Sequence, residues 1–578
     1  MNISEVKSKL RELWEILYKN NNIDLLDKFI EEINLIKSSP EFKATDNNWH
    51  KEAIVYSLYV DLFNKDFTGL KAKLPYLRNL GVNCLWLLPI LDSPMRDAGF
   101  DIRNYKSIRR DLITDNINLS EEEVLKIFKE FLDEAHKNNI RVIFDIALNH
   151  TSEEHPWFIN SRSSENSYYR DFYIWNKDTN KYKETRLLFK GMCPSNWQKD
   201  GDWFYFHRFF EFQPDLNYKN PLVLIEMTRN LLFWIKMGVD GFRADAIPYL
   251  WKEDGTNCEN LEQTHIIVKF LRCALEYVKP DIFLLAEACQ PPAEVVKYFG
   301  NEDECHAGYN FPLMPQIFIA LATQKAKPII DVLNPQITPA IPDSCQWFIF
   351  LRLHDELTLE MVTPNERDII NNYYKRDKRW DFRVGEGISA RLADLMEYNP
   401  QKIGLIYSIM LTLKGTPIVY YGDEFGKTND EAYFNKMIKI TGKEDTRFFV
   451  RGPIDWLYFQ EEINKSDSFN KKVFNIIQKQ LNTRKQFRCF ANGELEWIEL
   501  KNVKGEKCDN VLAYKRSYKD ENIIIINNLS DTAIKIKKTQ LLKNLTTKNL
   551  LNNSINLDDN YFILEPYAFL WIVTGIDL

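Results

Sequence analysis

Four short apolar stretches of this chain each end in charged or polar side chains. They are GFRADA (241–246), FDIALNH (144–150), LLAE (284–287) and FLRLHDE (350–356). Side chains alternate between the two faces of a β-strand, so Arg243 and Asp245 share a face, where the guanidinium can hold and orient the carboxylate. One such pair alone is more often a buried ion pair than a catalytic one. Four strands that all deliver carboxylates at their C-terminal ends instead predict a parallel sheet with a site along that edge.

The pattern from residue 49 onward predicts a barrel. Short apolar runs alternate with helical segments such as 121–138 and 222–237, which is typical of βα units. We expect strands near 54–59, 82–88, 140–146, 241–244, 282–286, 307–311, 348–351 and 417–421. Eight such units close as a TIM (β/α)8 barrel, an α/β fold whose chemistry lies where strands end and loops begin.

The remaining segments predict additions to that barrel. Two amphipathic helical patterns at 3–38 predict an N-terminal helical extension over residues 1–48. The barrel then spans 49–484, and the long connection between its third and fourth strands predicts an inserted domain at 151–217. Short β-rich runs separated by Asn, Asp and Ser turns predict a C-terminal β-sandwich over 485–578.

Composition excludes several classes of partner. The 578 residues are 45% apolar and 27% charged, which is ordinary for a soluble globular protein. The net charge of −7 and the absence of a basic stripe argue against a nucleic-acid partner. No apolar run approaches 18 residues and the N-terminus does not resemble a signal peptide, so we expect a cytoplasmic protein without a membrane partner. The nine cysteines are scattered, form no C-x-x-C pair and indicate reduced thiols. Oligomeric state is not predicted.

In their order along the chain, the four polar-ended segments resemble the four catalytic segments of the α-amylase superfamily of retaining glycoside hydrolases and transglycosylases. The segments QPDLN (213–217), DGTNCEN (254–260) and HDELTLEMV (354–362) are similar to those of superfamily members that interconvert maltose and trehalose. The resemblance is dense over residues 49–425 and weak at the two ends. It implies that the insertion at 151–217 corresponds to domain B of α-amylases, which forms one wall of the site.

The resemblance implies three catalytic carboxyl groups. Asp245 matches the nucleophile, Glu287 the general acid/base, and Asp355 the third acid, which binds sugar hydroxyls and stabilises developing positive charge. Cleavage with retention needs the first two carboxyl groups about 5–5.5 Å apart. We expect Arg243 to keep Asp245 ionised, and we expect burial after the apolar run 282–286 to raise the pKa of Glu287 toward that of a working acid.

The resemblance also implies a set of substrate-binding side chains. The two histidines His150 and His354 match those that hydrogen-bond glucose in the nonreducing pocket, and Asp145 matches the residue that supports the nucleophile and Arg243 from behind. The remaining substrate-binding candidates are Tyr105, Gln213, Arg243, Asp101 and Arg451.

The resemblance further implies that Asp101 and Arg451 form a pair that closes one end of the sugar pocket. Asp101, in GFDIRNY (99–105), matches the aspartate that grips the terminal glucose in exo-acting members, and Arg451 is its charge partner by a looser similarity. A pocket closed by an Asp/Arg pair favours disaccharides over starch chains, because a polymer needs an open cleft.

A structural calcium ion is the one cofactor that the resemblance implies. Its ligands would be Asn149, Asp215, Glu253 and the carbonyl groups of Tyr249 and Leu250, all oxygen donors that suit this hard cation. The alternative is that these polar groups only hydrogen-bond the junction with the inserted domain. We expect no organic cofactor.

The resulting hypothesis is a retaining glucosyltransferase that interconverts maltose and trehalose through a covalent glucosyl-enzyme on Asp245. One alternative is an α-glucosidase or α-amylase in which water accepts the glucosyl group, and another is a non-catalytic amylase-like scaffold. The presence of Asp245 and Glu287 argues against the scaffold. Leu353 stands where the superfamily carries asparagine before the His-Asp pair, so it either packs away from the sugar or changes a subsite.

Overall fold

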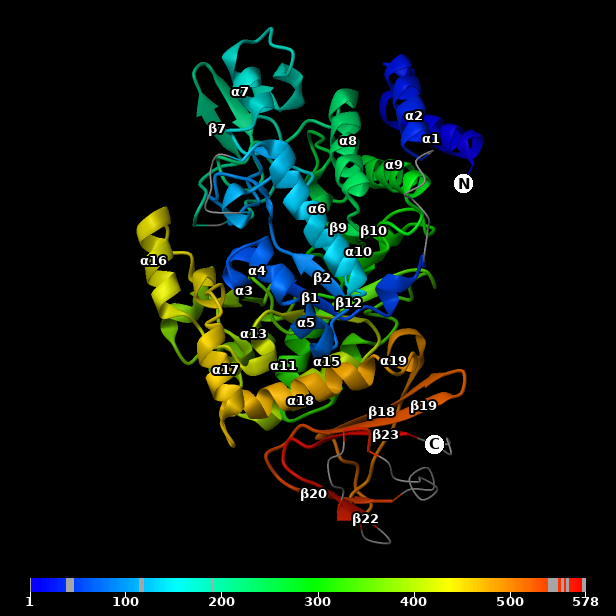
Figure 1. Cartoon of the computed structure of the whole chain (residues 1–578), viewed down its shortest axis with the longest axis vertical. Coiled ribbons are helices and arrows are strands. Elements are labelled where there is room, and N and C mark those ends of the chain that lie inside the picture. The colour runs from blue at the N-terminus through cyan, green and yellow to red at the C-terminus, as the bar shows by residue number, and fades with distance from the viewer. Residues whose placement is uncertain are drawn as a thin grey trace.

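The computed structural model describes residues 2–37, 46–113, 119–189, 191–538, 549–551, 556–557 and 561–573 (Figure 1). A closed barrel of eight parallel strands forms its centre. In spatial order these are β1 (Val55–Leu58), β2 (Cys84–Leu87), β5 (Arg141–Ala147), β9 (Gly241–Asp245), β10 (Phe283–Ala286), β11 (Ala307–Tyr309), β12 (Gln346–Phe350) and β16 (Thr416–Tyr420). The predicted TIM barrel is therefore confirmed, including the short sixth strand β11.

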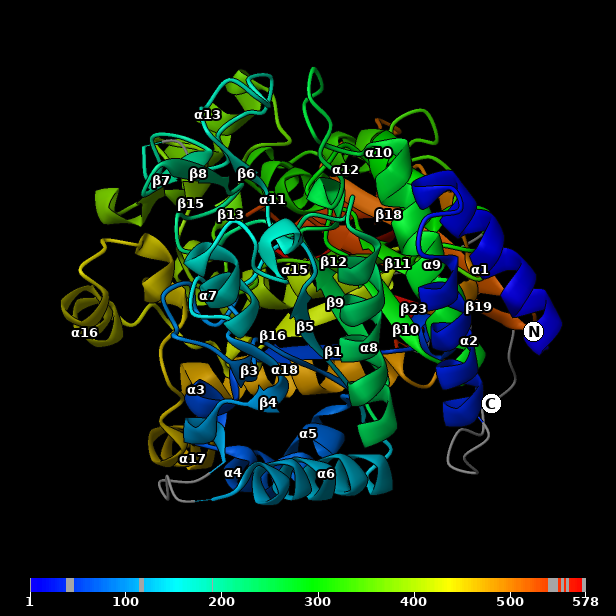
Figure 2. The same ribbon diagram turned by 90° about the horizontal axis from the view of Figure 1, so that it is seen from above.

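The barrel strands read as continuous apolar runs because both of their faces are covered. Side chains of β1, β2, β10 and β12 are buried at every position, and helices surround the barrel (Figure 2). Gly241 shows how closely neighbouring strands approach. A Cβ atom added there would lie 2.5 Å from the carbonyl oxygen of Phe283 on β10, so a larger residue would push β9 away from its neighbour.

The predicted helices outside the barrel core are present. α1 (Ile3–Tyr18) and α2 (Ile23–Lys37) form an N-terminal hairpin that packs on α9 (Glu262–Val278), while α6 (Glu121–Lys137) and α8 (Pro221–Met237) cover the barrel. Within the described ranges, no helix is long and apolar enough to cross a lipid bilayer.

Two excursions from the barrel carry small antiparallel sheets. The first, between β5 and β9, contains α7 (Pro156–Ser163) and a sheet of β6 (Trp175–Asn176), β7 (Trp197–Asp200) and β8 (Trp203–Phe206). The second follows β12 and contains a sheet of β13 (Leu357–Thr358), β14 (Asp381–Phe382) and β15 (Gly387–Ile388). Both leave the barrel at the C-terminal ends of its strands, where they can wall the site.

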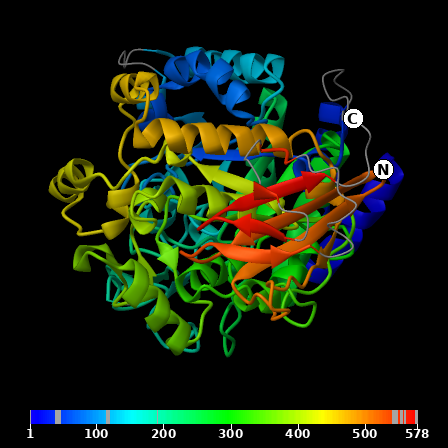
Figure 3. The ribbon, with the colours of Figure 1, turned by 90° about the horizontal axis from the view of Figure 1, so that it is seen from below.

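The C-terminal segment forms two antiparallel sheets that lie below the barrel (Figures 1 and 3). One contains β17 (Glu494–Trp497), β18 (Val511–Tyr518), β19 (Glu521–Asn528) and β23 (Phe569–Val573), and the other contains β20 (Ile534–Lys537), β21 (Asn556–Leu557) and β22 (Tyr561–Leu564). On β19, Ile523 and Ile525 join the barrel core, whereas Ile524 and Ile526 pack with the second sheet. The four consecutive isoleucines thus reflect a strand that is buried on both faces, as in the predicted sandwich.

Removal of the Trp14 side chain should destabilise the protein. Trp14 is fully buried in α1, its ring lies 6.1 Å from that of Phe270 on α9, and its Nε1 donates to the carbonyl oxygen of Asn21. Trp14→Ala should lower the free energy of unfolding by about 3–5 kcal/mol through the lost burial and the cavity left behind. Leu35→Ala, in α2 at a side chain that is 76% exposed, is the control and should change it by less than about 0.5 kcal/mol. Equal effects in urea unfolding would contradict this role of the hairpin.

Candidate active site

The register of three neighbouring barrel strands brings the predicted acidic residues together. Asp145 on β5 pairs with Arg243 on β9, and Ala244, which follows Arg243, pairs with Ala286 on β10, directly before Glu287. Arg243 and Asp245 share a face of β9 because they lie two residues apart. Parallel strands in register therefore deliver all four side chains to one end of the barrel.

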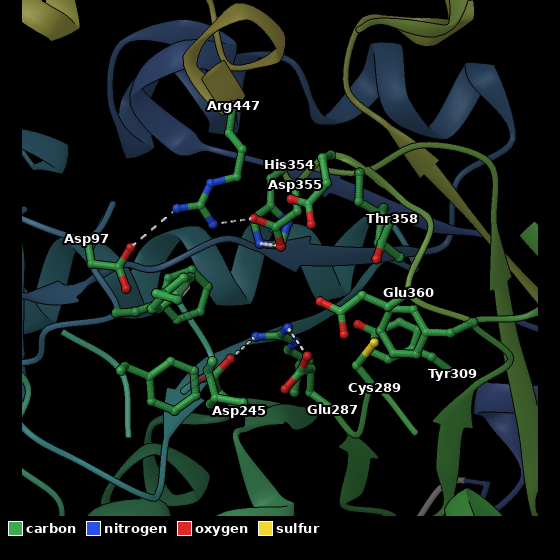
Figure 4. A pocket seen from close by; sticks show the side chains of 18 of the residues that line it. Asp97, Asp245, Glu287, Cys289, Tyr309, His354, Asp355, Thr358, Glu360 and Arg447 are labelled. Carbon is green, nitrogen blue, oxygen red and sulfur yellow. Dashed lines mark hydrogen bonds and ion pairs between the residues drawn. The ribbon is translucent and has the colours of Figure 1, made fainter. Parts of the chain in front are cut away.

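The guanidinium of Arg243 lies among three carboxyl groups. Its Nη1 is 2.6 Å from Oδ1 of Asp245 and 2.9 Å from Oδ1 of Asp145, and its Nη2 is 3.7 Å from Oε1 of Glu287. Trp86 Nε1 donates to the second oxygen of Asp145 at 3.0 Å. The predicted clamp between Arg243 and Asp245 is present in this geometry, and the cation also orients the other two acids. Figure 4 shows Asp245 and Glu287 side by side in the cavity wall.

One cation does not keep both Asp145 and Asp245 fully ionised. Burial raises the pKa of Asp145 to about 7, against the opposing effect of Arg243. Burial also raises the pKa of Asp245 well above its usual range; Arg243 opposes this, and the charges of Glu287 and Asp145 add to it. The expectation that Arg243 simply keeps Asp245 ionised is therefore incomplete, because the cluster retains a proton near neutral pH. Retaining glycosidases require one protonated and one ionised carboxyl group.

Asp355 lies in a second, more positive part of the site. Its Oδ2 is 3.1 Å from Nε2 of His354, and its Oδ1 is 3.1 Å from Nη1 of Arg447 and 3.0 Å from Nη2 of Arg451. Burial acts to raise the pKa of Asp355, but His354 and the two guanidinium groups hold it well below its usual range. Burial lowers the pKa of His354 to about 4, so the imidazole is neutral at neutral pH and the arginines supply the positive charge.

The cavity between these groups is closed at one end by Asp97 and Arg447. Both line the cavity, and Arg447 Nη2 lies 3.9 Å from Oδ1 of Asp97 (Figure 4). Asp101, the expected partner in such a cap, does not line the cavity: its carboxylate accepts hydrogen bonds from Ser93 Oγ and from the backbone N–H of Arg96. Asp101 shapes the loop that carries Asp97. The Asp/Arg pair at this end of the cavity is therefore Asp97 with Arg447, each of which lies four residues before the residue that was expected.

Tyr105 and Gln213 also lie behind the cavity wall. Tyr105 Oη donates to the carbonyl oxygens of Ala147 and His150, and it does not line the cavity. Gln213 Nε2 donates to Oδ2 of Asp97 at 3.0 Å and lies 3.4 Å from Nε2 of His150. In this geometry Tyr105 and Gln213 hold residues that line the cavity, and their own side chains do not line it.

The other predicted sugar-binding residues do line the cavity. These are His150, Arg243, His354 and Arg451. Leu353 lines it as well, so its side chain does not point away from the site as one reading of the sequence allowed. The wall next to His354 is therefore apolar where an asparagine would offer a donor and an acceptor.

Acidic and basic side chains of the second excursion line the opposite end of the cavity. Burial, with the charge of Asp355, raises the pKa of Glu356 to about 6. Arg383 Nη1 donates to Oε1 of Glu360 at 2.7 Å, and its guanidinium lies 4.9 Å from the ring centre of Phe189 in the first excursion. This contact brings the two excursions together beside the cavity.

Two of the predicted calcium ligands, Asn149 and Asp215, meet at the junction of the first excursion with the barrel, but they hold a lysine. Lys252 Nζ lies 2.6 Å from Oδ1 of Asn149 and 2.9 Å from Oδ2 of Asp215. Glu253 faces solvent, with its side chain 50% exposed, and pairs with Lys219 at 2.8 Å. Among the described residues, no three His, Cys, Asp or Glu side chains gather as a metal site. The arrangement does not fit calcium while Lys252 occupies it, and calcium stays a prediction.

Sequence patterns did not predict three residues of the site and its junction, namely Asp97, Arg447 and Lys252. The sequence features that could have indicated them differ from one residue to the next. Asp97 lies four residues before Asp101 in the same segment, RDAGFD, but only Asp101 was predicted to bind the sugar. Arg447 lies four residues before Arg451, in a segment with little similarity to draw on. Lys252 directly precedes Glu253 and follows an apolar run, but the spacing of the residues gave no sign that its ammonium would reach Asn149 and Asp215.

Comparison with known proteins identifies the family. Residues 39–502 match the family model described as alpha amylase, catalytic domain, and residues 503–571 match that described as maltogenic amylase, C-terminal domain. The chain belongs to the α-amylase family. It is therefore an α-amylase-family glycosidase or transglycosylase.

Two relatives and one solved structure show which members of the family the chain resembles. A protein described as trehalose synthase/amylase TreS from Mycolicibacterium smegmatis is 46% identical over 425 residues, covering 71% of this chain and 68% of that protein. A trehalose synthase from Pimelobacter sp. is 38% identical over 519 residues, covering 83% of this chain and 87% of that protein. The crystal structure of an α-amylase from H. orenii, 24% identical, superposes with a TM-score of 0.70 over 91% of this chain and 100% of that one, and shares the fold.

The carboxyl cluster around Arg243 predicts a shift of the pH profile. Asp145 raises the pKa of Asp245, so Asp145→Asn should lower it and move the acidic limb of kcat/KM, where the nucleophile takes up a proton, to lower pH by about one unit. Glu424→Gln is the control, because that buried carboxyl group also has a pKa raised to about 7 but hydrogen-bonds Tyr56 and Tyr76 outside the cavity lining. An unchanged limb, or a shift to higher pH, in the Asp145 variant would contradict this effect of Asp145 on Asp245.

Proposed function

We propose that this α-amylase-family enzyme interconverts maltose and trehalose by transferring a glucosyl group within one active site. The observation that carries the proposal is the small cavity, which is closed at one end by Asp97 and Arg447 and has Asp245 and Glu287 in its wall. Its volume of about 190 Å³ lies below the roughly 300–1,000 Å³ of pockets for drug-sized ligands. Such a cavity favours a disaccharide over a long α-glucan.

The first half-reaction would form a covalent glucosyl-enzyme. Asp245 Oδ attacks the anomeric carbon of the nonreducing glucose, and the glycosidic C–O bond breaks while Glu287 donates its proton to the leaving oxygen. Arg243 holds Asp245 in place for this attack through the 2.6 Å ion pair. Asp355, ionised between Arg447 and Arg451, can accept hydrogen bonds from sugar hydroxyls and stabilise the positive charge that develops on the ring.

The second half-reaction decides between isomerisation and hydrolysis. The released glucose presents its anomeric hydroxyl to the glucosyl-enzyme; Glu287 takes the hydroxyl proton as the new C–O bond forms and the ester to Asp245 breaks. Glu356, Glu360 and Arg383 offer polar groups that can retain the free glucose in the opposite end of the cavity. Attack by water at this stage would give the α-glucosidase outcome.

The proposal includes a cytoplasmic location. All nine cysteines lie in described residues and are free thiols, which suits a reducing compartment. An α-glucosidase or α-amylase activity is the second candidate function, since it needs the same carboxyl groups and one of the relatives has amylase in its description.

Carbon NMR of an incubation with maltose tests the proposal. Trehalose should accumulate faster than free glucose, and Asp245→Asn, which keeps the shape of the side chain, should reduce turnover by at least about three orders of magnitude because it lacks the nucleophile. Glucose without trehalose at any time would reject the isomerisation and leave the hydrolase. Near wild-type turnover of the Asn variant would remove Asp245 from its role.

Leu353 provides a test of how the cavity chooses its acceptor. The apolar side chain lines the cavity beside His354, where it keeps the wall free of a group that could bind water. Leu353→Asn should raise the ratio of hydrolysis to transfer by more than about threefold, equivalent to roughly 0.7 kcal/mol at the branching step. Leu359→Met, at a fully buried leucine that does not line the cavity, is the control. A wild-type product ratio in the Asn variant would show that Leu353 only packs.

A further inference from the structure

The ammonium group of Lys252 occupies the centre of the junction between the barrel and its first excursion. The Lys252 side chain is only 2% exposed, and that of Asp215 is fully buried. Besides Asn149 and Asp215, the carbonyl oxygen of Leu216 lies 3.4 Å from Nζ. Oxygens from the loop after β5 and from the end of the excursion therefore converge on one cation that the chain itself carries.

The charges at this junction balance without a metal. Of the five predicted calcium ligands, only Asp215 contributes a buried carboxylate, and Lys252 neutralises it. Glu253 cannot contribute in its present position, because it faces solvent and pairs with Lys219. A calcium ion placed beside the ammonium would bring three positive charges to one carboxylate in a poorly solvated site, which is strongly unfavourable.

We propose that Lys252 acts as the built-in cation of this junction, so that the site holds together without calcium. The ion pair would tie Asp215 to the loop of Asn149, whose carbonyl oxygen accepts a 2.8 Å hydrogen bond from the N–H of Leu216. His150 follows Asn149 directly, bridges to Asp215 through the backbone and lines the cavity. Lys252 is therefore a positioning residue for His150.

Chelation of the wild-type protein is the first test. After dialysis against EDTA the Tm should stay within about 1 °C, adding 1 mM CaCl₂ should not raise it, and elemental analysis should find well under one calcium per chain, since a ligand stabilises only the state it binds. A Tm that falls with EDTA and recovers with calcium, together with about one calcium per chain, would overturn the proposal.

Loss of the ammonium should loosen the junction. Lys252→Met keeps the length of the side chain but leaves the Asp215 carboxylate buried without its partner, so the Tm should fall by at least about 5 °C. At a temperature where circular dichroism shows the variant folded, KM should rise more than kcat falls, because His150 binds substrate in the proposed site. Lys219→Met, which removes an exposed lysine that pairs with Glu253, is the matched control and should change neither quantity. A Met variant with wild-type Tm and KM would overturn the proposal.

Replacement of the lysine by an acid should convert the junction into a calcium site. Lys252→Glu places a second carboxylate beside Asp215 and Asn149, so its Tm should be low in EDTA and rise by at least about 3 °C in 1 mM CaCl₂, with KM moving back toward the wild-type value. Lys252→Met should show no such response. If the Glu variant ignores calcium as well, the oxygens do not converge on a cation position and the proposal fails. The Tm and metal-content readouts do not depend on which α-glucoside the enzyme uses, whereas the KM readout rests on the proposed function.

Discussion

The interaction on which the site depends is the set of contacts that Arg243 makes with Asp145, Asp245 and Glu287. Three carboxyl groups in a water-poor barrel end would repel one another and take up protons without a cation between them. One guanidinium lowers this cost but cannot remove it, because burial still raises the pKa values of Asp145 and Asp245. The site therefore keeps a proton near neutral pH and the geometry of an ion pair at once. Retaining glycoside chemistry requires one protonated and one ionised carboxyl group.

The ends of the barrel strands supply only part of the cavity wall. Asp245 and Glu287 extend from strand ends and are placed by the hydrogen-bonded register of β5, β9 and β10. Arg447 and Phe189 come instead from long connections, which must be held against the barrel by contacts of their own. The Lys252 ion pair at the root of the first excursion and the contact of Arg383 with Phe189 beside the cavity are two such contacts. A change at either place should alter substrate binding without touching the carboxyl groups.

Local sequence patterns predicted the barrel because each of its βα units is specified by residues that are close together in the chain. Each strand of the barrel is a short apolar run bounded by turn residues, and each acidic residue follows its strand directly, so reading along the chain was enough to expect Asp245 and Glu287 at one edge. The same reasoning placed the two N-terminal helices, whose apolar spacing shows the face that packs on α9. Asp101 shows the limit: similarity of a segment does not say which of two aspartates turns into the cavity.

The sequence by itself determined the fold class, the family and the carboxyl groups, because strand periodicity, strand ends and ordered motifs are properties of neighbouring residues. Only the tertiary structure decided that Asp97 and Arg447 close the cavity, that Leu353 faces it, and that Lys252 lies among the predicted calcium ligands. Each of these depends on loops that are distant in sequence and meet in space: Asn149 and Lys252 are separated by the whole first excursion. Packing between such segments selects which side chain is buried and which charge neutralises it, and no local pattern records that choice.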